Sequence, residues 1–272
     1  MELLRPSSLD QLNGGLLIAG GTEVVPQLRE GLLQADTLVD ITALVPRGID
    51  GTRIGAGATL AEIEAAPQLP DVLREACRLA ASPQLRSMGS IGGNLLQSTR
   101  CWYWRLNYPC RLHGGDRCHA KEGEHREHAI FANDFCASAH PSDVAAALVA
   151  LGATFRTNRR ELAVHELYRL ADQDDRRTTT LEPGEVMLEL EVPPPDASVY
   201  LKAMDRKRWA FPLVGVAAAR RGSATTIALA GVAPIPWLLD GPLDEATPLR
   251  DTAYKVEIAR ALVGRAMAKL DN

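Results

Sequence analysis

The segment GSIGGNLLQSTRCWYWRLNYPC, residues 89–110, combines two chemical signals that decide how the chain must fold. Its first part, GSIGGN, is rich in glycine, which has no Cβ and lets a backbone approach a phosphate group closely. Its second part places tryptophan and tyrosine residues between Cys101 and Cys110. A segment suited to phosphate binding therefore runs directly into a cysteine-bearing loop.

A related glycine-rich segment, AGGTEV, occupies residues 19–24. We call residues 19–24 the first glycine segment and residues 89–94 the second glycine segment. The run LLIAGG predicts a buried strand that ends on two glycines, and TEVVPQLREG predicts a helix with Thr22 at its N-cap and Gly31 beyond its end. Neither segment matches the G-x-G-x-x-G or G-x-x-x-x-G-K-[ST] pattern, so a nicotinamide-binding Rossmann domain is not expected.

Further patterns predict more strands and helices on both sides of a long irregular loop. A strand is expected at residues 37–41, and RIGAGATLAEIEAA, residues 53–66, predicts another strand followed by a helix that the capping-box pair Thr59 and Glu62 begins. The segment HPSDVAAALVALGA predicts a helix that starts at Ser142 or Asp143. Residues 99–139, which we call the cysteine loop, follow neither a helical nor a strand period, so something must order them.

These patterns predict an α+β fold in three parts. Residues 1–55 form a small α/β unit and residues 56–157 a second unit that contains the cysteine loop. Residues 158–272 begin with a polar connection, continue as alternating antiparallel strands and end in a helix over residues 252–269.

The charge and the N-terminal sequence exclude several partners. The net charge of −4 supplies no basic field for a nucleic acid or an anionic membrane. The N-terminus does not read as a signal peptide, and no uninterrupted apolar run of 18 residues occurs. We therefore expect a cytoplasmic protein, or a periplasmic one if a partner carries the export signal.

Four of the five cysteines fall within 36 residues, together with most of the histidines. In a cytosolic chain such crowding indicates metal binding before disulfides. The gaps of 8, 7 and 17 residues lack the close pairs typical of zinc sites, yet four thiolates suit either an iron–sulfur cube or zinc, with His119 able to replace one cysteine. Cys77 lies in an amphipathic helical pattern and is expected to be a small buried apolar residue.

Six segments in register resemble one known family. They are LLIAGGTEVVPQL, SMGSIGGNLLQ, HPSDVAAALVALGA, EPGEVMLELEVP, YLKAMDRKRWAFPLVGVAAA and ALAGVAPIPW. Their order and spacing resemble the FAD-binding medium subunit of the molybdenum hydroxylases, the family of xanthine dehydrogenase and carbon monoxide dehydrogenase. The resemblance covers nearly the whole chain. It implies a two-part FAD-binding domain of the vanillyl-alcohol-oxidase/CO dehydrogenase flavoprotein type, followed by a C-terminal α+β domain.

The resemblance also implies a set of FAD-binding residues, because the family binds FAD between its first two domains. The residues that would wrap the diphosphate from the two sides are Ala19, Gly20, Gly21, Thr22 and Glu23 in the first glycine segment, and Ser90, Ile91, Gly92, Gly93 and Asn94 in the second.

Four further positions carry two interpretations each. Asp143 matches an acidic residue that binds ribityl or ribose hydroxyls, or it caps its helix. Met187 lies near the adenine or the ring, or is a core strand residue. Lys202 lies near the flavin, where a cation favours anionic reduced forms, or is an exposed strand lysine. Trp209 covers a ring face or packs in the core.

The cysteine loop resembles an insertion found in one subbranch of the family. That subbranch includes the β subunit of 4-hydroxybenzoyl-CoA reductase and the FAD subunit of a bacterial aldehyde oxidoreductase, where four cysteines hold a [4Fe–4S] cluster. The resemblance implies that the cluster ligands here are Cys101, Cys110, Cys118 and Cys136. The nearby aromatic residues would shield the cluster or contact a partner.

The resemblance implies an electron-transfer FAD subunit of a multi-subunit molybdenum-dependent hydroxylase, dehydrogenase or reductase. Its partners would be a molybdenum-cofactor large subunit and a [2Fe–2S] small subunit, and no catalytic residue is assigned in this chain. Two alternatives stay open at this point. One is a self-contained flavin oxidoreductase of the vanillyl-alcohol type, and the other is a zinc-stabilised scaffold that binds partners without redox chemistry.

Overall fold

A computed structural model describes residues 1–12, 14–207 and 210–271. Its N-terminal part is a three-stranded parallel sheet in the order β1-β3-β2, with strands β1 (Glu2–Leu4), β2 (Leu16–Ile18) and β3 (Thr37–Asp40). Helix α1 (Val24–Arg29) connects β2 to β3, as a parallel pair requires a crossover. The prediction of Thr22 as N-cap is wrong, because Glu23 holds that position, without a side-chain cap bond.

A five-stranded antiparallel sheet forms the second part, in the order β4-β5-β8-β6-β7. Its strands are β4 (Ile49–Asp50), β5 (Arg53–Gly55), β6 (Thr154–Thr157), β7 (Glu161–Ala163) and β8 (Met187–Glu191). The helices that follow β5 are α2 (Leu60–Glu64), α3 (Asp71–Ala80), α4 (Pro83–Arg86) and α5 (Ile91–Leu95). The predicted capping box of Thr59 and Glu62 at α2 is confirmed.

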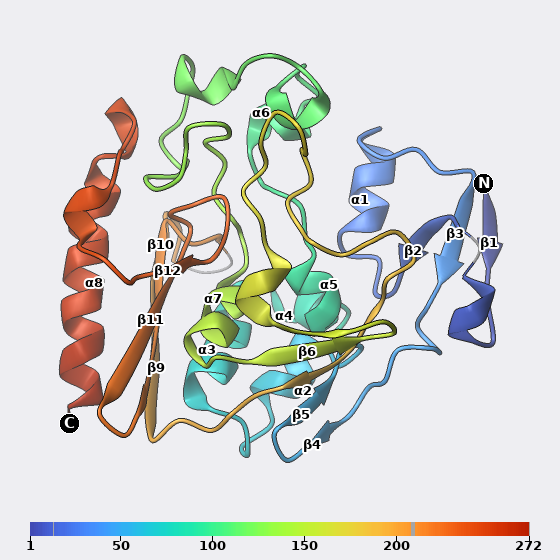
Figure 1. Ribbon diagram of the computed structural model, residues 1–272, viewed down its shortest axis with the longest axis horizontal. Helices are drawn as coiled ribbons and strands as arrows, with labels where there is room; N and C mark the ends of the chain where they lie inside the picture. Colours follow the sequence, from blue (N-terminus) through green and yellow to red (C-terminus); the bar gives the residue numbers. More distant parts are fainter. Residues whose placement is uncertain (13, 208–209, 272) are drawn as a thin grey trace.

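The C-terminal part is a four-stranded antiparallel sheet in the order β12-β11-β10-β9. Its elements are β9 (Ala197–Ala203), β10 (Val214–Arg221), β11 (Ala224–Ala230), β12 (Trp237–Leu238) and the long helix α8 (Tyr254–Leu270). Helix α8 covers one face of this sheet, while α3 and α7 (Asp143–Ala150) pack against the other (Figure 1). The predicted antiparallel strands and final helix are therefore confirmed.

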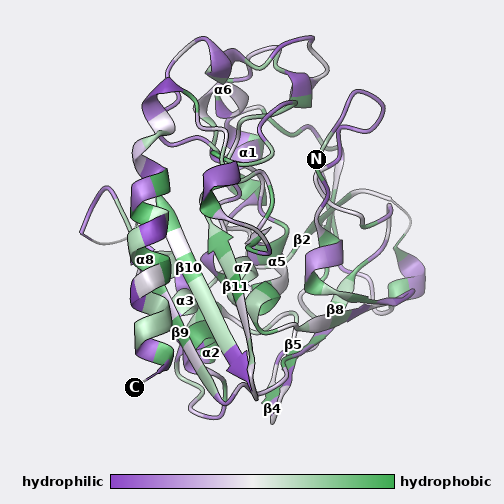
Figure 2. Ribbon diagram, turned by 60° about the vertical axis from the view of Figure 1, so that its left-hand side comes forward, coloured by the Kyte–Doolittle hydropathy of each residue, from purple (hydrophilic) through white to green (hydrophobic). Residues whose placement is uncertain are grey.

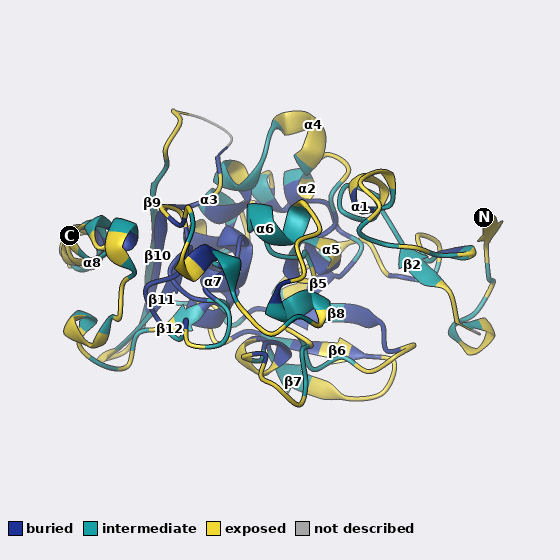
Figure 3. Cartoon of the chain, turned by 90° about the horizontal axis from the view of Figure 1, so that it is seen from above, coloured by how far each residue is buried: buried dark blue, intermediate teal, exposed yellow. Residues whose placement is uncertain are grey.

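Both faces of the four-stranded sheet are buried, and the strand alternation explains how. In β10, Val216 and Ala218 belong to the core beneath α8, whereas Ala217 and Ala219 belong to the core around α7. Figure 2 shows these apolar strands beside α8, which carries both polar and apolar residues. Figure 3 shows the buried residues gathered around α7 and this sheet, while the N-terminal sheet is less buried.

The cysteine loop crosses the top of the molecule in Figure 1, between α1 and α8. Its regular elements are the short helix α6 (Trp102–Arg105) and two 3-10 turns at Arg111–His113 and His119–Lys121. Tethers to the C-terminal part hold it, since the Ile130 amide donates to the Val232 carbonyl at 2.7 Å. The irregular loop predicted from the missing periodicity is therefore ordered largely by contacts with distant residues.

The sheets group the strands across the expected domain boundaries. The five-stranded sheet contains strands from all three expected parts, residues 1–55, 56–157 and 158–272. Sheet membership alone does not define domains, so the three-part division stays a prediction. The predicted α+β class is confirmed. Within the residues that the structure describes, no helix has the length and apolar character needed to span a membrane.

Candidate functional site

The two glycine segments line one cleft of about 840 Å³ that opens to solvent, which we call the glycine cleft. Its predicted lining residues are Ala19, Gly20, Gly21, Thr22, Glu23, Ser90, Gly92, Gly93 and Met187. Ile91 instead packs in the core, and the Asn94 side chain accepts a hydrogen bond from the Ser142 hydroxyl at 2.6 Å. Met187 is both a buried strand residue and part of the cleft wall, so its two interpretations coincide geometrically.

The first glycine segment offers backbone donors to the cleft. Among the described residues, the amides of residues 20–24 donate no hydrogen bond to the protein. In the second segment, three amides already have partners within the protein. The Ile91 amide donates to the Ala58 carbonyl, and the Gly92 amide donates to the Ala56 carbonyl. The Gly93 amide donates to the Ser90 hydroxyl. A row of unpaired amides beside glycine is the arrangement that binds an anionic diphosphate. The first segment therefore presents unpaired backbone donors to the cleft, and the second forms part of its wall.

The glycines differ in what an added side chain would meet. A Cβ on Gly20 would lie 1.9 Å from the Met88 carbonyl oxygen, so this glycine lets the two segments touch. Gly21 has φ +72°, a left-handed conformation that favours glycine. A Cβ on Gly93 would meet the Ser90 hydroxyl at 3.0 Å and no other described atom within 4 Å. The residues present fit a bound diphosphate, with Gly20 setting the shape of the site.

Glu23 connects the glycine cleft to the start of the cysteine loop. Its carboxylate accepts hydrogen bonds from Arg100 Nη2 at 2.6 Å and from Arg105 Nη2 at 2.7 Å. It also accepts from the Ser98 amide at 3.1 Å and from the Gln27 side chain at 2.7 Å. Because all of these groups are partly buried, Glu23 is an ionic link between the two regions.

Asp143 and Lys202 form an ion pair in the interior, with Lys202 Nζ 2.8 Å from Asp143 Oδ2. Lys202 also donates to the Leu79 carbonyl at 2.9 Å, and the Tyr200 hydroxyl donates to Asp143. Burial raises the pKa of Asp143, and the nearby Lys202 ammonium opposes that shift. The interpretation of Lys202 as an exposed lysine is wrong, because its side chain is 0% exposed.

Neither side chain of this pair lines the glycine cleft. Ser142, and not Asp143, is the N-cap of α7, where its hydroxyl accepts from the Ala145 amide at 3.0 Å. Asp143 begins the helix itself. The flavin contacts expected for Asp143 and Lys202 stay predictions, and Trp209 lies outside the described residues.

The four clustered cysteines line one small space of about 280 Å³, which we call the cysteine cavity. All five cysteines of the chain are free, and Cys77 lies fully buried in α3, as predicted. Within the described ranges, no group of three His, Cys, Asp or Glu side chains is arranged to hold a single metal ion. The cavity therefore brings four free thiols together.

The cysteine sulfurs have different neighbours. His128 Nε2 lies 3.2 Å from Cys101 Sγ, and the Cys136 thiol lies 3.3 Å from the Ser138 hydroxyl. The Cys136 thiol beside Cys118 lowers the pKa of Cys118, while burial raises the pKa of Cys101 to about 11. His119 lines the cavity and stacks on Tyr103. The cavity is thus lined by both aromatic and hydrogen-bonding side chains.

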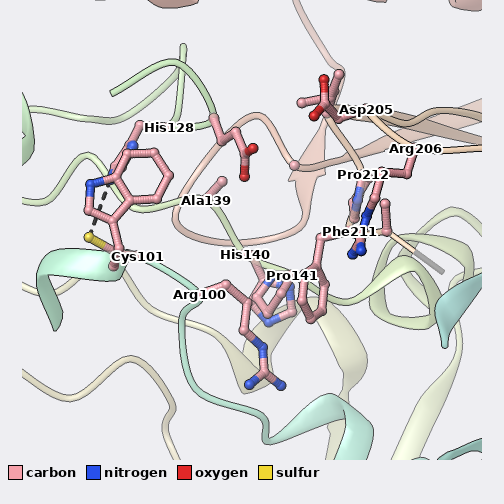
Figure 4. A pocket seen from close by; sticks show the side chains of 15 residues that line it. Arg100, Cys101, His128, Ala139, His140, Pro141, Asp205, Arg206, Phe211 and Pro212 are labelled. Carbon is pink, nitrogen blue, oxygen red and sulfur yellow. Dashed lines mark hydrogen bonds between the residues drawn. The ribbon is translucent and has the colours of Figure 1, made fainter. Parts of the chain in front are cut away.

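A second space of about 720 Å³, which we call the outer cleft, lies between the cysteine loop and the C-terminal part. Figure 4 shows His128 and Cys101 on one side of it, with Arg206, Phe211 and Pro212 on the other. Cys101 lines both the outer cleft and the cysteine cavity.

Arg100, Arg105 and His128 were not predicted as site residues. Their hydrogen bonds to Glu23, Glu23 and Cys101 join residues 77, 82 and 27 positions apart, so no local sequence pattern indicates these contacts. The one available signal was that Arg100 directly precedes Cys101 at the entry to the loop.

The sequence matches the family described as FAD binding domain in molybdopterin dehydrogenase over residues 3–195. The chain belongs to this family. It is 33% identical to the aldehyde oxidoreductase FAD-binding subunit PaoB of Escherichia coli (strain K12) over 255 residues, covering 86% of this chain and 79% of that protein. It is 32% identical to the nicotinate dehydrogenase FAD-subunit of Eubacterium barkeri over 115 residues, covering 36% and 39%.

A similar fold occurs in carbon monoxide dehydrogenase from Hydrogenophaga pseudoflava, with a TM-score of 0.71 and 23% identity over 99% of this chain and 96% of that chain. These comparisons confirm three predictions. The chain is an FAD-binding medium subunit of the molybdenum hydroxylase family, it is an oxidoreductase subunit, and its cofactor is FAD.

Proposed function

We propose that this chain is the electron-transfer subunit of a multi-subunit molybdenum-dependent hydroxylase, dehydrogenase or reductase. It carries FAD in the glycine cleft and a [4Fe–4S] cluster in the cysteine cavity, as in the family subbranch with an inserted cluster loop. Its partners are a molybdenum-cofactor large subunit and a [2Fe–2S] small subunit. Bound FAD supplies the exchange between two-electron and one-electron transfer, and the cluster supplies one-electron transfer.

The glycine cleft supports the assignment of the FAD residues. The unpaired amides of residues 20–24 would hold the diphosphate, and Ser90, Gly92 and Gly93 would close the opposite side. Apolar side chains such as Met187 would exclude water from the bound group. The buried pair of Asp143 and Lys202 belongs to this proposal through the family resemblance.

The cysteine cavity is compatible with a cluster, because four free thiols share it. Four thiolates suit either an iron–sulfur cube or a zinc ion. The choice of the cube rests on the resemblance to the subbranch with an inserted cluster loop.

The observation that carries the proposal is the physical link between the two sites. The cysteine loop leaves the second glycine segment within a few residues, and Glu23 of the first segment binds Arg100 and Arg105 of that loop. Covalent and ionic connections therefore hold the two sites close together. Close spacing is what electron transfer between two cofactors requires.

The test is anaerobic purification of the complex from its native host, with flavin, iron, sulfide and zinc measured per chain. We expect one FAD and four irons per copy of this chain after subtraction of the irons of the [2Fe–2S] subunit, and no zinc. The separated chain should oxidise no aldehyde or alcohol. Zinc in place of iron would overturn the cluster assignment, and turnover by the separated chain would support a self-contained flavin oxidoreductase.

A further inference from the structure

His128 is the one histidine of the described residues with a recorded contact to a cysteine sulfur, at 3.2 Å from Cys101 Sγ. It is 98% buried, since only 2% of its surface is exposed, and it lines the outer cleft. Figure 4 shows the imidazole aimed at the sulfur across this side of the cleft. The proposed function uses Cys101 as a ligand and gives His128 no role.

We propose that His128 is a positioning residue that donates an Nε2–H···Sγ hydrogen bond to the Cys101 thiolate and thereby raises the reduction potential of the cluster. The proposal rests on the proposed function, because it requires a cluster held by Cys101. In this role His128 changes the reduction potential of the cluster without being one of its ligands.

The surroundings of the ring decide which nitrogen carries the proton. Among the described residues, His128 Nδ1 is buried and has no hydrogen-bond partner. A proton on Nδ1 would leave a buried donor unpaired and would turn the Nε2 lone pair toward a negatively charged sulfur. A proton on Nε2 points a donor at the sulfur and leaves Nδ1 as an unpaired acceptor, so it avoids the repulsion between the lone pair and the thiolate. The tautomer with Nε2–H facing Cys101 is therefore the favoured one.

Neighbouring groups hold the ring in this position. The Trp102 ring meets His128 edge to face, with centroids 4.8 Å apart and planes at 83°. The His128 amide donates to the His125 carbonyl at 2.9 Å, and His125 Nδ1 is in turn bonded to the Ala120 carbonyl at 2.9 Å. The donor is thus oriented before any cofactor binds, as expected for a residue that tunes a ligand.

The effect on the potential has a defined sign. A hydrogen bond to a cluster thiolate withdraws charge from sulfur and stabilises the more negative, reduced cluster more than the oxidised one. Removal of the donor therefore lowers the potential. Cys101 is a sensitive place for such tuning, because it is the one clustered cysteine that also lines the outer cleft.

The experiment is a potentiometric titration of the purified complex with dithionite, followed by electron paramagnetic resonance of the reduced cluster. At the ambient potential where half of the wild-type cluster is reduced, His128→Leu should lower the reduced-to-oxidised ratio by up to about tenfold. His128→Gln keeps an N–H near the Nε2 position and should recover part of this change. In the wild type labelled with ¹⁵N-histidine, pulsed resonance should detect an exchangeable proton on a histidine nitrogen coupled to the cluster, and His128→Leu should lose it. The label separates this proton from those of the Tyr103 and Trp104 amides, which also bond to the Cys101 sulfur.

His165→Leu is the control, because His165 is exposed and lines neither the cysteine cavity nor the outer cleft. Its cluster should keep the wild-type ratio within about twofold. If the wild-type complex contains no cluster, the proposed function fails before any titration. If the cluster is present and His128→Leu leaves the ratio unchanged, or the wild type shows no exchangeable proton, the role of His128 is overturned while the proposed function stands. If His128→Leu does not assemble, the Gln variant and the wild-type proton signal decide.

Discussion

The glycine cleft and the cysteine cavity are close along the chain but are built from different chemistry. The cleft depends on backbone groups, with glycines that let two segments touch and amides that stay unpaired. The cavity depends on four side chains carried by a loop whose order comes largely from distant tethers. Added atoms should therefore damage the cleft, whereas the loss of side-chain groups should damage the cavity.

The largest expected effect separates the two sites completely. Cys110→Ser should lose most of the iron and keep FAD, because it removes one of four ligands without touching the cleft. Cys77→Ser is the control and should keep both cofactors, since Cys77 lies in the core of α3. Iron and flavin analysis of the purified proteins measures this. Equal iron loss in both variants would show that the wrong thiols were chosen.

The next prediction tests whether larger side chains in the glycine cleft weaken FAD binding. Gly20→Val together with Gly93→Val should weaken FAD binding by about tenfold or more, because the Gly20 Cβ enters the space of the Met88 carbonyl. Gly264→Ala on α8 has open space and should bind FAD normally. Fluorescence titration of FAD into the apoprotein is the measurement. Normal affinity in a folded double variant would remove these segments from the FAD site.

A smaller effect should appear where the two regions are joined. Glu23→Gln leaves Arg100 and Arg105 without their shared carboxylate and should destabilise the chain by about 1–3 kcal/mol. Proteolysis within the cysteine loop should become faster. Glu30→Gln is the control, because Glu30 is half exposed and lies 3.8 Å from Arg105. If urea unfolding and proteolysis gave equal results for both variants, Glu23 would not be the link.

The smallest effect concerns a tether of the cysteine loop to α8. Lys255 Nζ donates to the Glu127 and Gly231 carbonyls at 2.7 and 2.9 Å, and burial lowers the pKa of Lys255 to about 7. An unfolded lysine keeps its proton up to about pH 10.4. Between these pH values the unfolded chain binds more protons, so stability should rise with pH.

Lys255→Met should remove this dependence. The wild type should therefore gain on the order of 1 kcal/mol relative to Lys255→Met as the pH is raised from about 7 to about 10. Urea unfolding of both proteins across this range measures the difference. Parallel pH curves would show that Lys255 does not change its proton binding on folding.

Much of the fold could be predicted because its signals are local. The Thr59 and Glu62 capping box, the strand ending at the first glycine segment and the final helix each depend on neighbours in sequence. The exact start of α1 could not be predicted. Thr22 is a residue type that often caps helices, but the helix begins after Glu23. The Glu23 side chain makes no cap bond there and instead binds Arg100 and Arg105, which lie far along the chain.

Local sequence carries the chemical groups of this protein: two glycine segments, four clustered cysteines and the register of motifs that marks an FAD-binding subunit. Long-range packing sets which of these groups face one another. It placed Gly20 against Met88, buried Lys202 against Asp143, and brought His128 to Cys101. The physical reason is that these contacts join residues far apart in the chain. Their energies depend on burial and distance, which appear only once the chain is packed.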